Sequence, residues 1–273
     1  MDKRLFIVIL VAVVLVSFGV YLTVNKNSDS TGKEDRRPSF TEAQELYDQA
    51  ITLKESNEVS KAKELLKQIV AEHPDFKDID SVQKNLEELN LKIIFSGLET
   101  SDTILHEVKS GDTLGKIAKQ YNTTLELIKR SNNLKSDTIR LGQRLRIWKG
   151  TFSVLVDKSQ NILILSSNNE VVKVYRVSTG ADNNTPVGTF TIVNKLIDPV
   201  WFKSGAIIPP ESPKNVLGTR WMGFDIPGYG IHGTVEPETI GQQVTAGCLR
   251  MRNEEVEELY SLLPVGTKVT VVD

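Results

Sequence analysis

The residues best suited to chemistry in this sequence are its single cysteine, Cys248, and a histidine sixteen residues before it, His232. A thiol is a useful nucleophile only as a thiolate, so its pKa of about 8.5 must fall or a base must stand beside it. An imidazole with a pKa of about 6.5 can take that proton at neutral pH and return it to a leaving group. The pair could therefore support nucleophilic catalysis, although a lone cysteine is more often a small buried apolar residue.

The neighbours of this pair fit the same chemistry. Gly233 and Gly247 lack a Cβ, which lets backbone approach a substrate closely. The amides around Gly247 and Cys248 could then point at a developing oxyanion. On an extended segment Arg250 would share a face with the cysteine, where its charge would stabilise a thiolate or hold a substrate carboxylate. The alternatives are a turn role for the histidine and a surface ion pair between Arg250 and Glu254.

Composition excludes several other classes of function. The net charge of -2 over 273 residues gives no bulk attraction to nucleic acid. One cysteine rules out an intramolecular disulfide. A metal site is not predicted, because the cysteine and the histidine lack enough neighbouring ligands at standard spacing.

The cysteine and the histidine lie in a segment, residues 150–273, with a β-rich pattern. Short apolar strands separated by turns are predicted at residues 151–157, 161–167, 171–180, 185–196 and 266–273. One helix is predicted between Asn253 and Leu263, with Asn253 as its N-cap. A strand or strand end carrying His232, a loop through Pro237 and a return segment would then present Cys248.

Residues 106–148 form a second pattern, within a domain predicted to span residues 105–149. A strand-like "HEVK" precedes "SGDTL", two short helical faces follow, and "IRLGQRLRI" alternates like a strand. The spacing from Thr123 to Glu126 is that of a capping box for the second helix. This strand-helix-helix-strand unit resembles the LysM domain, and the resemblance implies binding to the N-acetylglucosamine-containing glycan of peptidoglycan or chitin.

Residues 41–97 show three apolar stripes at helical spacing. The stripes centre on residues 43–51, 62–70 and 79–93, and "HPDF" ends the second because proline disfavours helical geometry in the residue before it. Two helices, a proline stop and a third helix resemble a tetratricopeptide repeat with a capping helix. The segment is interpreted either as a three-helix spacer or as a docking surface for a protein partner.

The N-terminal residues 1–25 predict a membrane anchor. Residues 5–24 carry no charge and would span about 30 Å as a helix, the thickness of the hydrocarbon core. Signal-peptide apolar regions are shorter and end in a small-x-small cleavage site, which is not found here. Residues 26–40 are polar, lack apolar periodicity and are predicted to be a linker.

The strings around the two reactive residues resemble the active-site signature of the YkuD-type L,D-transpeptidases. "YGIHGT" and "IGQQVTAGCLRM" carry the resemblance, with support from "VSTG", "TPVGTFTI", "LGTRWM" and "LPVGTKVTV". The resemblance covers residues 151–273. It implies that Cys248 is the nucleophile and His232 the base, with supporting or substrate-binding roles for Gly233, Thr245, Gly247 and Arg250. Ala246 departs from the pattern, because many members have histidine there.

The resemblance also implies a reaction that needs no metal or nucleotide cofactor. The cysteine would attack the carbonyl of the third-position diamino acid in a peptidoglycan tetrapeptide, release D-alanine and pass the acyl group to an amine of another stem. The same acyl-enzyme could instead attach a wall protein, exchange a D-amino acid or react with water. Two alternative functions remain: a non-enzymatic wall-binding scaffold and, more distantly, a sortase.

The predicted fold is therefore multidomain. It joins a transmembrane helix, a small all-α segment, a βααβ LysM module and a β-rich catalytic domain. The expected partners are glycan strands, stem peptides and, through the N-terminal helix, the cytoplasmic membrane. Because peptidoglycan lies outside that membrane, the catalytic domain is expected to be extracytoplasmic on a single-pass protein.

Overall fold

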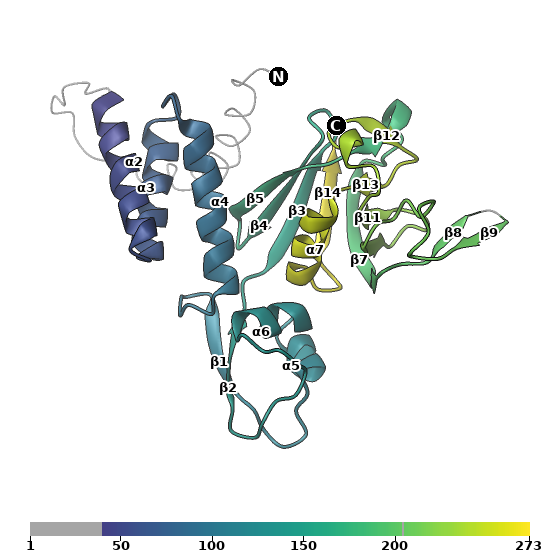
Figure 1. Cartoon of the computed structure of the whole chain (residues 1–273), viewed down its shortest axis with the longest axis horizontal. Helices are drawn as coiled ribbons and strands as arrows, with labels where there is room; N and C mark the ends of the chain where they lie inside the picture. The colour runs from purple at the N-terminus through teal and green to yellow at the C-terminus, as the bar shows by residue number, and fades with distance from the viewer. Residues whose placement is uncertain (1–39, 204) are drawn as a thin grey trace, which may run out of the picture. The chain divides into compact units, whose positions relative to one another are not determined.

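A computed structural model of the chain describes residues 40–203 and 205–273. These residues fall into two compact units, which divide between Leu89 and Asn90. Figure 1 labels their helices and strands. The predicted anchor and the predicted linker up to residue 39 lie outside the described residues. Within the described ranges, none of the helices is long and apolar enough to cross a membrane.

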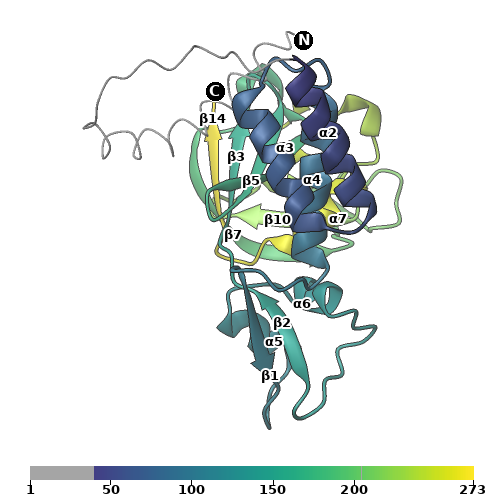
Figure 2. The ribbon, with the colours of Figure 1, turned by 90° about the vertical axis from the view of Figure 1, so that its left-hand side faces the viewer.

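The first unit consists of the predicted helices. They are α2 (Phe40–Glu55), α3 (Val59–Glu72) and α4 (Ile79–Phe95), and the boundary between the units falls inside α4. The three helices lie side by side (Figure 2). Their apolar stripes bury Leu66, Ile69 and Leu89 completely. The three predicted helices are thus confirmed, and α3 ends at Glu72, with His73 as its C-cap immediately before the proline.

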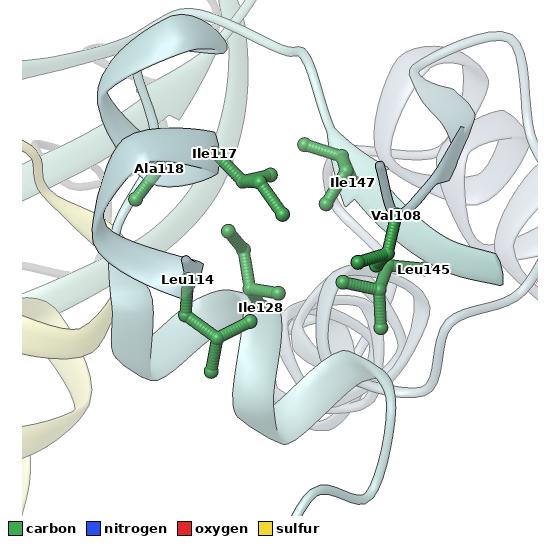
Figure 3. Close-up of a cluster of buried hydrophobic side chains, with 7 residues drawn as sticks. All are labelled: Val108, Leu114, Ile117, Ala118, Ile128, Leu145 and Ile147. Carbon is green, nitrogen blue, oxygen red and sulfur yellow. The ribbon is translucent and has the colours of Figure 1, made fainter. Parts of the chain in front are cut away.

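The predicted βααβ module is also present, at the start of the second unit. Strands β1 (Thr103–Glu107) and β2 (Arg144–Trp148) pair antiparallel, and helices α5 (Leu114–Gln120) and α6 (Leu125–Ser131) lie between them in sequence. Figure 3 shows side chains from both helices and from β2 meeting in one core. The capping residue of α6 differs from the prediction by one position, because the Thr124 side chain, and not Thr123, accepts from the Leu127 amide.

The C-terminal part is built on one eight-stranded sheet. Its order is β13-β11-β10-β7-β14-β3-β4-β5. The strands, in chain order, are β3 (Phe152–Asp157), β4 (Ile162–Ser167), β5 (Glu170–Arg176), β7 (Gly188–Ile197), β10 (Arg220–Phe224), β11 (Gly230–His232), β13 (Leu249–Arg250) and β14 (Lys268–Val272). The predicted strands are present, but the last one, β14, lies between β7 and β3 and runs parallel to β3.

Short elements complete this part of the fold. Strand β6 (Thr179–Gly180) pairs with β12 (Gln243–Thr245), and β8 (Trp201–Lys203) pairs with β9 (Ala206–Ile208) in a hairpin that extends away from the sheet (Figure 1). Single 3-10 turns occur at Ala181–Asn183 and Pro237–Thr239. The segment predicted as one strand at residues 171–180 is therefore divided between β5 and β6.

Helix α7 (Asn253–Leu262) packs against β10 and β11 through its apolar face. Val256 and Leu259 on that face are fully buried. The predicted N-cap is wrong, since Arg252 occupies the cap position without a side-chain cap bond and Asn253 is the first helical residue. At the other end, Lys195 of β7 donates to the carbonyl oxygens of Tyr260 and Leu263, which satisfies carbonyls that the helix leaves open.

Candidate active site

Strand pairing brings the segments that carry the two reactive residues together at one edge of the sheet. Strand β11 ends at His232 and runs parallel to β13, with Ile231 opposite Leu249 and His232 opposite Arg250. Cys248 directly precedes β13, and its thiol donates to the carbonyl oxygen of Gly228, 3.3 Å away, just before β11. The predicted strand end and return segment are therefore neighbours, although fifteen residues separate their reactive side chains along the chain.

His232 is held in one tautomer by a backbone contact. Its side chain is buried, and Nδ1 lies 2.7 Å from the carbonyl oxygen of Gly233. A carbonyl oxygen only accepts, so Nδ1 carries the proton and Nε2 is left as the acceptor. Burial lowers the pKa of His232 to about 4; the carbonyl contact opposes this shift and the charge of Arg250 adds to it. The imidazole is consequently a neutral base at pH 7.

Cys248 carries a protonated thiol in the same environment. The side chain is half-buried. Burial raises the pKa of the thiol, against opposing effects from a backbone hydrogen bond at Gly230 and from the charge of Arg250. A neutral imidazole and a neutral thiol thus lie on adjacent segments at this edge of the sheet. This arrangement suits general-base activation at the moment of attack better than a preformed ion pair.

Thr245 and Gly247 shape the turn that presents the thiol. The Thr245 hydroxyl donates to the carbonyl oxygen of Cys248 at 2.7 Å and accepts from the Gly247 amide at 3.1 Å. Gly247 has a φ of +129°, and a Cβ there would lie 2.6 Å from the ring of Tyr229. The glycine is therefore required by close packing and by backbone conformation. Because its amide already donates to Thr245, it is not the oxyanion donor that the sequence suggested.

Thr185 is a functional candidate that the sequence analysis did not single out. Its buried hydroxyl accepts from the Gly180 amide at 2.8 Å and donates to the Gly247 carbonyl at 2.9 Å. The Thr185 carbonyl in turn accepts from the buried ammonium of Lys158 at 2.8 Å. The only signal in the sequence was its place in the string "TPVGTFTI", because Gly247 lies 62 residues away and no local pattern indicates that contact.

Thr185→Val tests this connection. Valine keeps the shape but leaves a buried amide and a buried carbonyl unpaired, which is expected to lower the free energy of unfolding by about 2–4 kcal/mol. The cysteine turn should shift, and the acylation rate should fall by about 10- to 100-fold. Denaturant unfolding and acylation kinetics measure the two effects. Thr189→Val, at an exposed position on β7, is the matched control, and equal behaviour of the two variants would contradict the role.

Arg250 contacts neither the thiol nor the predicted partner Glu254. Its guanidinium donates from Nη1 to Glu236 at 2.8 Å and to the Thr239 hydroxyl at 3.0 Å. Its side chain is buried, and among the described residues its Nε has no hydrogen-bond partner. The arginine thus fixes the turn at Pro237–Thr239, while its charge lowers the pKa values of both Cys248 and His232 from a distance.

The space beside Gly233 is filled by another side chain of the protein and does not admit substrate. A Cβ at Gly233 would collide with the side-chain oxygen of Asn253, and one at Gly218 would do the same. The Asn253 oxygen accepts from the amides of Thr219 and Thr234, and its amide donates to the Thr234 carbonyl. The expectation that Gly233 admits a substrate is therefore wrong. The glycine instead lets helix α7 fix the loop that follows His232.

Metal-assisted chemistry was not expected from the sequence. In the part of the chain that the structure describes, His, Cys, Asp and Glu side chains form no group of three or more that could hold a metal ion. The site consists of a thiol, a neutral imidazole and surrounding side chains that hold the backbone through hydrogen bonds.

Two family models match the chain in the regions described above. The model for the L,D-transpeptidase catalytic domain, YkuD, matches residues 151–271. The model for the LysM domain matches residues 106–148. The two matched regions coincide with the eight-stranded sheet and its helix, and with the βααβ module.

Curated relatives point the same way. YqjB of Bacillus subtilis, whose name assigns it to the L,D-transpeptidases, is 44% identical over 126 residues, covering 44% of this chain and 70% of YqjB. YkuD of the same organism, with the same assignment in its name, is 31% identical over 175 residues, covering 62% of this chain and 98% of YkuD. Among solved structures, an L,D-transpeptidase from Mycobacterium tuberculosis H37Rv is 19% identical with a TM-score of 0.40, covering 49% of this chain and 63% of that one.

Proposed function

The chain belongs to the YkuD family of L,D-transpeptidases, which are cysteine-dependent acyltransferases, and on that premise we propose that Cys248 and His232 cross-link peptidoglycan stems. The observation that carries this proposal is the pairing of β11 with β13. It makes the segment that presents the half-buried thiol the neighbour of a strand that ends at an imidazole, whose Nδ1 is fixed on the Gly233 carbonyl. The remaining residues of the site position these two.

The first half of the reaction forms a thioester. His232 takes the thiol proton on Nε2 as Sγ attacks the carbonyl carbon of the third-position diamino acid of a tetrapeptide stem. The Gly247 amide is engaged by Thr245, so the Cys248 amide is the proposed donor to the oxyanion. The bond to the terminal D-alanine then breaks, and the imidazolium returns its proton to the leaving amine. The products are free D-alanine and an acyl-enzyme.

The second half transfers the acyl group to an acceptor. The amine of another stem's diamino acid attacks the thioester carbonyl and gives a proton to His232. The thiolate leaves and recovers that proton, so the enzyme returns to its starting state and a new amide joins two stems. Thr245 and Thr185 hold the cysteine turn during both steps, and Arg250 holds the turn that precedes it.

The LysM module indicates that the protein binds peptidoglycan, which places it at the cell wall with its catalytic domain outside the cytoplasm. We propose domain limits of 105–149 for this module and 150–273 for the catalytic domain. Binding to glycan strands would raise the effective concentration of stem peptides at Cys248. The apolar residues 5–24 are the proposed membrane anchor, with the helices of residues 41–97 as a spacer or a docking surface.

The test uses a fragment that begins at Arg37, incubated with purified disaccharide-tetrapeptide and analysed by mass spectrometry. The expected product is a dimer that has lost one D-alanine. Loss of D-alanine without a dimer would retain the acyl-enzyme and contradict an amine of a second stem as acceptor, in favour of water or another amine. If the folded, reduced fragment releases no D-alanine at all but still binds insoluble peptidoglycan, the non-enzymatic scaffold replaces this proposal.

A further inference from the structure

We propose that Trp221 is a positioning residue for His232, holding the imidazole plane so that Nδ1 stays on the Gly233 carbonyl and Nε2 stays open to the thiol proton. This inference rests on the proposed role of His232 as the base. The tryptophan lies in the string "LGTRWM". The resemblance to the family assigns it no role.

Strand register puts the two rings on one face of the sheet. Trp221 of β10 lies directly opposite His232 of β11, and directly opposed residues in an antiparallel pair point to the same side. The ring centroids are 6.0 Å apart, and the planes differ by 21°. This is an offset stack, the arrangement that aromatic pairs prefer over a face-to-face sandwich. The indole therefore covers a face of the imidazole that the contact to Gly233 leaves unconstrained.

The indole is itself held in place by one side chain and two glycines on neighbouring strands. Its Nε1 donates to the side-chain oxygen of Asn194 on β7 at 2.9 Å. Two glycines make space for it: a Cβ at Gly223 would lie 2.8 Å from Nε1, and one at Gly230 would lie 3.0 Å from the far edge of the indole ring. Strand β7 thus supplies a hydrogen bond, and the glycines of β10 and β11 leave the space that this one orientation of the tryptophan needs.

This support matters because a buried imidazole has to change charge during the reaction. One hydrogen bond at Nδ1 leaves the ring able to tilt, and a tilt moves Nε2 away from the thiol. The stacked indole opposes the tilt, and its electron-rich face attracts the imidazolium that forms on proton transfer. The charge of Arg250 acts in the opposite sense on that cation, so the attraction of the indole face offsets part of this repulsion.

Trp221→Leu and Trp221→Phe test the proposal in the Arg37 fragment. Leucine keeps apolar cover without a stack and is expected to lower kcat for acylation by about 30-fold, with KM within about twofold. Phenylalanine keeps a stacking face and should recover most of that loss. The matched control is Met222→Leu, because Met222 is the next residue of β10, is buried and faces the opposite side of the sheet.

Nitrogen-15 NMR of the labelled histidines gives a readout independent of turnover. Wild type should show His232 as the Nδ1–H tautomer at pH 7, whereas Trp221→Leu should show a mixture of tautomers. An unchanged tautomer together with unchanged kcat in a folded Trp221→Leu variant would overturn the inference. If wild type releases no D-alanine but the tautomer still depends on Trp221, the positioning stands and only the proposed reaction fails. Should the leucine variant not fold, Asn194→Leu, which removes the anchor of the indole, takes its place with the same expectations.

Discussion

Replacing Cys248 by alanine is expected to abolish release of D-alanine, with a loss of at least about 10⁴-fold in the rate of acylation. Alanine removes the atom that would form the thioester, and no other thiol exists in the chain. Mass spectrometry of the products from disaccharide-tetrapeptide, and of the intact protein for the acyl adduct, measures both consequences. A variant that keeps more than a trace of turnover would show that another group attacks the stem peptide.

The alanine variant also separates wall binding from chemistry. The Cys248 side chain is half-buried, and its hydrogen bond to the Gly228 carbonyl is a weak thiol contact. The alanine variant should therefore keep the fold. Binding to insoluble peptidoglycan should equal that of the wild type, since the LysM core contains none of the residues around the thiol. Cys248→Ser is the closer control. It keeps the shape, but a hydroxyl is a far weaker nucleophile, and this variant should be nearly as inactive as alanine.

Local patterns in the sequence predicted the elements of the fold well. Apolar residues at helical spacing predicted α2, α3 and α4, and two short apolar runs separated by a turn predicted the hairpin of β3 and β4. Such patterns record only which side of an element is buried. They contain no information on which distant strand becomes the neighbour, so the insertion of β14 between β7 and β3 could not be foreseen.

The roles of the residues around the site were even harder to predict from local sequence patterns. The types and spacing of Cys248 and His232 suggested a thiol and a base, because few chemistries use that pair. The tasks of their neighbours depend on what fills the adjacent space. Gly233 admits an asparagine side chain from α7, and Arg250 turns to Glu236, which lies fourteen residues earlier. Thr185 has partners at Gly180 and Gly247 that only the folded chain brings together.

The second large effect is expected from His232→Gln, which should lower acylation at pH 7 by about 10³-fold. Glutamine preserves polarity but cannot accept and return the thiol proton. Wild-type kcat/KM should stay level from about pH 5 to 8 and fall only as the pH approaches 4, because the neutral imidazole is the competent form and burial lowers its pKa to about 4. In the variant the rate should rise with pH toward the raised pKa of the Cys248 thiol.

These profiles discriminate between two resting states of the site. A thiolate–imidazolium pair would be alkylated rapidly by iodoacetamide at pH 5, whereas a protonated thiol reacts slowly there and faster as the pH rises. The neutral pair described here predicts slow alkylation at pH 5 in wild type. An acid limb of kcat/KM near 6.5, or rapid alkylation at low pH, would contradict a buried neutral base.

The free energy of unfolding should depend on pH through protonation of the same His232 imidazole. Because the pKa of His232 is about 4 in the folded protein and 6.5 is its ordinary value, the unfolded chain binds this proton first as the pH falls. Stability is therefore lost between about pH 6.5 and 4, by roughly 3 kcal/mol from this group. Urea unfolding of wild type and His232→Gln across that range should show a smaller decline in the variant by about that amount. Equal declines would mean that the imidazole is not buried as a neutral group, and the general-base role would lose its physical basis.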